Sequence, residues 1–313
     1  MRMSSQIKCL NSAIIMAITL ILATGCAGTT KVQVPSENKD SHVAVIVIHH
    51  TSSDFGESLH VLTKRTDRPV SSHYLIPEPG DASYEAENLQ TYQLVDDEER
   101  AWHAGASYWK ELTQLNNLSI GIELVNRTYC HESAHLPEAE YSDWPAETIC
   151  FYPDFDDGQL RLLVELLAEL KERHVEVDPT HIVGHSDVAP QRKIDPGPRF
   201  PWQRLYKLGY GAWYDDETVV RYWDQFFMHM PSVFQVQRAL HAYGYQIEQT
   251  GASDLQTRNV LRAFQMHFVP WQVTGEITPE TAAVLYALIE KYYPDELGPL
   301  LEDSTSAPRE VDS

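Results

Sequence analysis

A nearly continuous apolar run at residues 42–48 restricts the fold of this chain more than any other feature. It reads His-Val-Ala-Val-Ile-Val-Ile, rich in β-branched residues and without polar alternation, which predicts a strand buried on both faces. Residues 119–125 and 180–185 have the composition of two further strands. In the first of these, Ile122 and Leu124 share one face of the strand, while Glu123 points to the other.

A helix is predicted between those two strands. Asp156 can cap its start, with Gln159 three residues later as the reciprocal partner. An apolar stripe at helical spacing follows, made of Leu160, Leu163, Val164, Leu167 and Leu170. Strands and helices within residues 41–215 therefore predict one α/β domain. Residues 128–155 have no periodicity, so we expect them to form an inserted loop.

Three short amphipathic helices are predicted after residue 228, beginning near Ser232, Asp254 and Thr278. They predict a small C-terminal three-helix domain over residues 228–293. Residues 294–313 are acidic and rich in Ser and Pro, so we expect a disordered tail there.

The N-terminus has the pattern of an export signal. Residues 1–25 combine a basic start with an apolar stretch at 14–22 that is too short to span a bilayer, and Gly25 precedes Cys26. A small residue before a cysteine resembles the cleavage box of bacterial lipoproteins, in which that cysteine carries the lipid. Cys26 is therefore the predicted lipidation site, and residues 26–40 are the predicted tether. An ordinary cleaved signal and an uncleaved anchor are the alternatives.

Cys130 and Cys150 remain once the signal and the lipidation site are set aside. In an oxidising compartment an even remainder predicts a disulfide, which would close the inserted loop. Two free thiols or a metal pair are the alternatives, although no further cysteine lies nearby in the sequence to complete a zinc cluster.

Two histidines and an aspartate follow the predicted strands in a pattern typical of a metal site. His49 and His50 end the first strand, His185 ends the third, and Asp195 follows in the sequence Asp-Pro-Gly-Pro. Two imidazoles and one carboxylate leave the fourth position of a tetrahedral zinc ion open, as a catalytic zinc requires. Pro196 favours an extended backbone at Asp195, which restricts the loop. Alternation places His49 and His50 on opposite faces of the strand, and the residue pattern alone does not choose between them.

Alternative sites are open on the residues alone. His181 and His185 have the spacing of a helical ligand pair, but no Glu follows His181 and the residues between them are strand-like, unlike the metalloprotease helix. Four further histidines can each be structural: His73, His103, His131 and His135. The formal net charge of −21, from 24 basic and 45 acidic residues, argues against nucleic acid as a partner.

Five sequence blocks in order carry a family resemblance: residues 47–49, 71–76, 101–105, 119–126 and 184–198. Together they resemble the type 2 N-acetylmuramoyl-L-alanine amidases, which are related to the peptidoglycan recognition proteins. Residues 250–265 resemble the type 1 peptidoglycan-binding domain, with a generic three-helix bundle as the alternative. The resemblance implies a central mixed β-sheet flanked by helices, followed by a small helical domain that binds the cell wall.

The resemblance also implies the roles of individual residues. It implies a Zn2+ ion bound by His49, His185 and Asp195, with Glu123 as the general base and Lys193 stabilising the oxyanion. Substrate contacts are implied for His50, Thr51, His73, Trp102, His103 and Asn126.

The implied substrates are peptidoglycan and muropeptides, cut between N-acetylmuramic acid and L-alanine. We expect the lipid to anchor the protein in the outer membrane, facing the periplasm. A non-catalytic peptidoglycan receptor and a metallopeptidase acting within the stem peptide are the competing functions.

Overall fold

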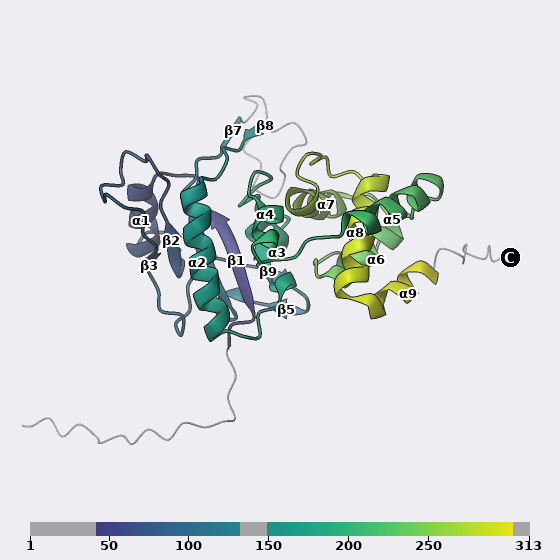
Figure 1. Ribbon diagram of the computed structural model, residues 1–313, viewed down its shortest axis with the longest axis horizontal. Coiled ribbons are helices and arrows are strands. Elements are labelled where there is room, and N and C mark those ends of the chain that lie inside the picture. Colours follow the sequence, from purple (N-terminus) through teal and green to yellow (C-terminus); the bar gives the residue numbers. More distant parts are fainter. Residues whose placement is uncertain (1–41, 132–148, 303–313) are drawn as a thin grey trace, which may run out of the picture. The chain divides into compact units, whose positions relative to one another are not determined.

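The computed structural model describes residues 42–131 and 149–302 (Figure 1). Its central sheet has five strands in the order β3-β2-β6-β1-β9. β1 (Val45–His50) pairs in parallel with β6 (Ser119–Leu124) on one side and with β9 (Ile182–Gly184) on the other. β2 (Tyr74–Ile76) is parallel to β6, and β3 (Tyr92–Gln93) runs antiparallel at the edge. The predicted central mixed sheet is confirmed.

The central strand and its covering helix follow from the sequence pattern. Every residue of β1 is buried, and α2 (Asp157–Arg173) shares a core with the sheet through its leucine stripe (Figure 1). Asp156 and Gln159 form the predicted capping box at the start of α2. The third strand is shorter than predicted, because Pro179–His181 forms a 3-10 turn, η2, and His185 begins the short helix α3 (His185–Val188).

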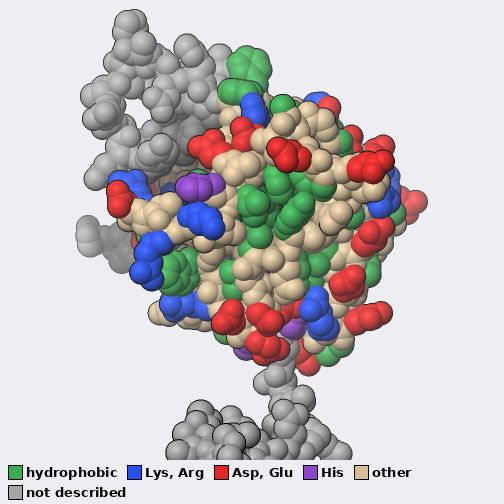
Figure 2. Space-filling view, turned by 90° about the vertical axis from the view of Figure 1, so that its left-hand side faces the viewer, with side chains coloured by type: hydrophobic (Ala, Val, Ile, Leu, Met, Phe, Trp, Pro, Cys, Tyr) green, Lys and Arg blue, Asp and Glu red, His purple; other side chains and the backbone are tan. Residues whose placement is uncertain are grey.

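The segment between β1 and β6 contains short elements that were not predicted from the sequence. They are α1 (Phe55–Thr63), β2, β3, β4 (Tyr108–Trp109), β5 (Leu112–Thr113) and the 3-10 helix η1 (Leu115–Asn117). Phe55 and Leu62 of α1 form a small second core with Leu75 and Val125. Figure 2 views the molecule from the side of α1 and β3, and shows apolar side chains at the centre of this face, acidic side chains above, below and to the right of them, and basic side chains on the left.

The base of the predicted inserted loop is a two-stranded ladder rather than an irregular segment. β7 (Tyr129–His131) pairs antiparallel with β8 (Ile149–Phe151), and Cys130 lies opposite Cys150 in the register. Cys150 is disulfide-bonded. Residues 132–148 of the insertion lie outside the described residues.

The C-terminal part is helical. It contains α4 (Trp202–Lys207), α5 (Asp216–Met228), α6 (Val233–Tyr243), α7 (Leu255–Phe268), α8 (Pro279–Tyr292) and α9 (Pro294–Glu302). The predicted caps Ser232, Asp254 and Thr278 begin α6, α7 and α8. No helix of residues 42–131 and 149–302 has the length and hydrophobicity of a transmembrane span.

The prediction of a disordered tail is wrong for residues 294–302, which form α9. Leu300 is buried, and Leu297 and Leu301 pack against the same core, so an apolar stripe at helical spacing decides the structure despite the acidic composition. The remaining residues of that tail, 303–313, lie outside the described part of the chain.

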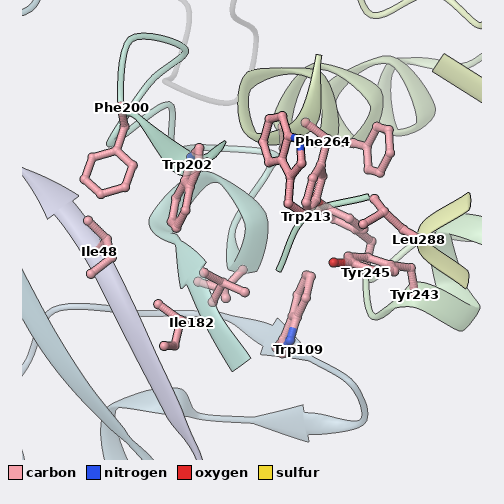
Figure 3. Close-up of a cluster of buried hydrophobic side chains, with 14 of the residues drawn as sticks. Ile48, Trp109, Ile182, Phe200, Trp202, Trp213, Tyr243, Tyr245, Phe264 and Leu288 are labelled. Carbon is pink, nitrogen blue, oxygen red and sulfur yellow. The ribbon is translucent and has the colours of Figure 1, made fainter. Parts of the chain in front are cut away.

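One hydrophobic core continues from the sheet into the C-terminal helices (Figure 3). The ring of Trp109, on β4, lies 5.0 Å from that of Tyr245, and the ring of Trp202, on α4, stacks on His267 of α7 at 3.8 Å. The predicted domains, residues 41–215 and 228–293, are therefore not separated by a break in packing.

Candidate metal centre

The carboxyl ends of β1, β6 and β9 meet at one edge of the sheet, where ligand sites of α/β proteins commonly form. His49 is the penultimate residue of β1 and lies opposite Glu123 of β6 in the register. His185 directly follows β9 as the first residue of α3. The N–H of Ser186 donates to the backbone carbonyl of Asp195 at 2.8 Å. This hydrogen bond holds the loop that carries Asp195 next to the start of α3.

Three side chains meet at this edge as predicted donors of a metal site. Nδ1 of His49 lies 3.0 Å from Oδ2 of Asp195, and Nδ1 of His185 lies 3.1 Å from the same oxygen. All three residues are buried, and their ligand atoms lie within 4.8 Å of one another. In the described part of the chain, no other group of three His, Cys, Asp or Glu side chains is gathered in this way.

The hydrogen bonds of His185 assign its tautomer. Its Nε2 lies 3.3 Å from the carbonyl oxygen of Ala104, which can only accept, so Nε2 carries the proton. Burial lowers the pKa of His185 to about 4, so the ring is neutral at neutral pH and Nδ1 presents a lone pair to Asp195. Two acceptors this close repel each other unless a cation lies between them. The donor set of imidazole nitrogens and a carboxylate therefore fits a metal ion, with zinc the ion that this composition suits.

Glu123 stands beside the three donors without joining them. Its Oε1 lies 4.0 Å from Nδ1 of His49, and its side chain is only 13% exposed. Its Oε2 is buried and has no hydrogen-bond partner among the described residues. Burial raises the pKa of Glu123 to about 7, a value at which a carboxyl group can both accept and return a proton at neutral pH.

The centre lies in a pocket that also contains several of the predicted substrate contacts. Its lining includes His50, Thr51, Trp102, His103 and Lys193. Trp102 is 45% exposed and offers an aromatic surface at the site, while Lys193 is half-buried. This arrangement leaves room for a polar substrate beside the metal donors.

Of the two histidines at the end of β1, His49 and not His50 lies within hydrogen-bond distance of Asp195. The ring of His50 is held by hydroxyls, with Ser52 Oγ 3.1 Å from its Nδ1 and Thr128 Oγ1 3.1 Å from its Nε2. His50 therefore lines the pocket with both ring nitrogens next to hydroxyl groups.

His73 and Asn126 lie outside the pocket lining. Nδ1 of His73 accepts from the N–H of Gly121, and its Nε2 donates to the carbonyl oxygen of Glu99. Asn126 is buried and donates to the carbonyl oxygen of Asp154. Substrate contact by either residue stays a prediction, and neither position supports it.

One wall of the pocket was missed from the sequence. Val61 and Leu62 of α1 line it, together with Arg192, whose guanidinium donates to the carbonyl oxygens of Ala104 and Ala106. A sequence signal for α1 was present, because Asp54 is followed three residues later by Glu57, the spacing of a capping box. In the structure Asp54 is the N-cap of α1, and its side chain accepts from the N–H of Glu57.

Comparison with known families agrees with this geometry. Residues 39–198 match the family described as N-acetylmuramoyl-L-alanine amidase. The chain belongs to the N-acetylmuramoyl-L-alanine amidase family. Residues 229–285 of this amidase match a second family, described as a putative peptidoglycan binding domain.

Relatives resemble this amidase over most of its length. The N-acetylmuramoyl-L-alanine amidase AmiD of Escherichia coli (strain K12) is 37% identical over 292 residues, which cover 90% of this chain and 98% of that protein. A putative N-acetylmuramoyl-L-alanine amidase of Rickettsia conorii is 29% identical and covers 70% of this chain and 72% of that protein.

Solved structures give the same result. AmpDH3 from Pseudomonas aeruginosa has a TM-score of 0.73 at 39% identity, over 83% of this chain and 96% of its own. AmiD from E. coli, in complex with the substrate anhydro-N-acetylmuramic acid-L-Ala-D-gamma-Glu-L-Lys, has a TM-score of 0.68 at 36% identity, over 83% and 93%. The chain is accordingly an enzyme, an N-acetylmuramoyl-L-alanine amidase, with the fold that its sequence blocks predict.

Proposed function

We propose that this amidase is a zinc enzyme that hydrolyses the bond between N-acetylmuramic acid and L-alanine in peptidoglycan or its soluble fragments. The observation that carries the proposal is the buried group of His49, His185 and Asp195, with Glu123 beside it in an accessible pocket. The substrate class is supported by AmpDH3 of P. aeruginosa, solved with an anhydromuramic pentapeptide, and by AmiD of E. coli, solved with an anhydromuramyl peptide.

His49, His185 and Asp195 would hold the ion, and three protein ligands would leave it able to bind water or substrate as well. When bound there, zinc supplies a Lewis acid that polarises the scissile carbonyl and makes water more acidic.

Glu123 and Lys193 would carry the proton and stabilise the developing charge. Glu123 would accept the proton of the attacking water and return it to the departing amine of L-alanine, for which a pKa near neutrality suits both directions. Lys193 lines the same pocket and would stabilise the oxyanion as the carbonyl carbon becomes tetrahedral.

The remaining parts of the chain would place the enzyme at its substrate. The match of residues 229–285 to a putative peptidoglycan binding domain supports a role for the C-terminal helices in holding the wall. The export pattern of residues 1–25 and the cysteine at position 26 support a lipoprotein anchored in the outer membrane and facing the periplasm. Residues 1–26, which carry this pattern, lie outside the described residues.

Digestion of purified sacculi and of soluble muropeptides, with the products identified by mass, tests the proposal. We expect intact stem peptides beginning with L-alanine, loss of activity with a chelator, and recovery when Zn2+ is added back. Products cut within the stem peptide would indicate a metallopeptidase instead. Zinc-loaded protein that binds sacculi but releases nothing would indicate a receptor.

A further inference from the structure

A chain of buried side chains leads from His49 into the protein, away from Asp195. Nε2 of His49 lies 3.0 Å from Nδ1 of His103, and Nε2 of His103 lies 3.2 Å from Oγ of Ser119. The hydroxyl of Ser119 donates to the carbonyl oxygen of Leu115 at 2.5 Å. His49, His103 and Ser119 are 1%, 8% and 3% exposed, so water hardly competes for these hydrogen bonds.

The far end of this chain fixes the direction of every bond in it. The carbonyl oxygen of Leu115 can only accept, so it takes the single proton of the Ser119 hydroxyl. Oγ of Ser119 then accepts from His103, whose Nε2 therefore carries a proton. The ring of His103 is buried and forms no ion pair with a described carboxylate, so nothing in the described residues stabilises a positive charge on it; the neutral ring has an acceptor at Nδ1. Nε2 of His49 must donate to it.

This direction determines which atom of His49 faces the metal site. A neutral imidazole with its proton on Nε2 has its lone pair on Nδ1, the atom that lies 3.0 Å from Oδ2 of Asp195. His185 reaches the same tautomer through a backbone acceptor, the carbonyl oxygen of Ala104. The tautomer of His49 depends instead on a side chain, and so on the amino acid at position 103.

The strand β6 is shaped to receive the ring of His103. Ser119, Gly121 and Glu123 alternate along β6 and so point to the same face of the sheet. A Cβ atom at Gly121 would lie 2.5 Å from Cγ of His103, closer than side chains pack, so only glycine leaves room for the imidazole. Ser119 binds the ring on one side of this space, and Glu123 lies opposite His49 at the other.

We propose that His103 is a positioning residue for His49, which it holds in the tautomer and orientation that offer Nδ1 to the metal ion. The proposal rests on the zinc site of the proposed function. Residues that hold the second nitrogen of a histidine ligand contribute to metal affinity in this way, because they fix the proton on the nitrogen that does not bind the metal.

Zinc affinity of the full-length protein, measured by competition with a chelator, tests this role in folded variants. We expect His103→Leu to bind zinc about 10- to 100-fold more weakly, the usual loss when such a partner is removed. His103→Asn should recover much of the affinity, because Oδ1 of Asn can accept near the position of Nδ1. His174→Leu is the matched control: His174 is 4% exposed, lies 3.6 Å from Asp97, and is not part of the metal centre, so this variant should keep the affinity.

A second measurement needs no variant. In the unaltered zinc-loaded protein, NMR of isotope-labelled histidine nitrogens should show His103 and His49 protonated on Nε2. A proton on Nδ1 of His103, or a folded His103→Leu protein with unchanged zinc affinity, would overturn the positioning role. If the unaltered protein binds no zinc, the proposed function fails as well. If the unaltered protein binds zinc and folded His103→Leu binds it equally well, only the positioning role fails, so the two outcomes can be told apart.

Discussion

Nδ1 of His267 lies 2.7 Å from Oδ2 of Asp187, and both side chains are buried. His267 belongs to α7 in the C-terminal helices, while Asp187 lies two residues after His185 of the candidate metal centre. Asp187 also accepts from the hydroxyl of Tyr245 at 2.6 Å and from the N–H of Gly184 at 2.7 Å. Residues of the C-terminal part therefore hold the turn that presents His185.

Tyr245→Phe would remove one of the donors of the buried carboxylate of Asp187. A buried acceptor left without its donor costs about 1–3 kcal/mol, so we expect the free energy of unfolding to fall by that amount. Tyr243→Phe is the matched control, because Tyr243 is also buried and its hydroxyl has no hydrogen bond to a described residue. Denaturant unfolding of both variants measures the difference, and equal losses would contradict this account.

The roles of the proposed metal donors and of the proposed base can be separated by substitution. His185→Ala removes one of three donors, so zinc occupancy and activity should fall together. Glu123→Gln removes no donor and changes little volume, so the protein should keep its zinc while losing on the order of a hundredfold or more in rate. Zinc content and turnover measured on the same preparations check both outcomes. Zinc loss in Glu123→Gln would make Glu123 a fourth ligand.

The pH dependence of the rate gives an independent test of Glu123. Burial raises its pKa to about 7, and the protonated form cannot accept a proton from water, so kcat/KM should fall as the pH drops through this range. A cation bound beside the carboxylate favours its charged form and would move the fall to lower pH. The residual activity of Glu123→Gln should not show this acid limb. If the limb persisted in that variant, another group would be the base.

Features of the fold that depend on a local residue pattern could be predicted from the sequence. Features that depend on contacts between distant segments could not. The burial of β1 and the caps Asp156, Ser232 and Asp254 follow from residue type and spacing, and the structure confirms them. The choice of His49 over His50 followed only from the family resemblance, because both residues lie in β1 and only the position of Asp195 distinguishes them.

Contacts between residues that are distant in the sequence could not be predicted from any local residue pattern. His103 and Ser119 come together because Gly121 leaves room for a ring, and Asp187 meets His267 because two helices pack across a shared core. The strand β3 was missed for a related reason, because it has only two residues and becomes ordered by pairing with β2. The helix α9 was missed because the acidic composition of residues 294–313 was given more weight than its short leucine stripe.

Cys130 and Cys150 provide a prediction about the exported protein. They lie opposite each other in the ladder of β7 and β8, and Cys150 is disulfide-bonded. We expect both thiols to resist alkylation in envelope protein until a reductant is added. Closing a loop of about 20 residues stabilises a fold by roughly 3 kcal/mol, so reduction should lower the Tm while leaving zinc content nearly unchanged. Rapid alkylation without a reductant would refute the bond.

Lys193 lines the pocket two residues before Asp195, and its ammonium has no hydrogen-bond or ion-pair partner among the described residues. The adjacent cation, Arg192, is occupied by the carbonyl oxygens of Ala104 and Ala106. Lys193 is therefore the cation of this loop that is available to an anion forming in the pocket.

Lys193→Ala should leave zinc in place and weaken transition-state stabilisation by roughly 3 kcal/mol, on the scale of a lost oxyanion donor. Because the oxyanion exists only during the reaction, the loss should fall on kcat, with KM little changed. Lys207→Ala makes the same change of charge on the exposed side of α4, outside the pocket lining, and is the matched control. Steady-state kinetics on a soluble muropeptide, with zinc measured in each preparation, separates the outcomes. A rise in KM at constant kcat would make Lys193 a substrate-binding residue, because the interaction would then already be complete before the oxyanion forms.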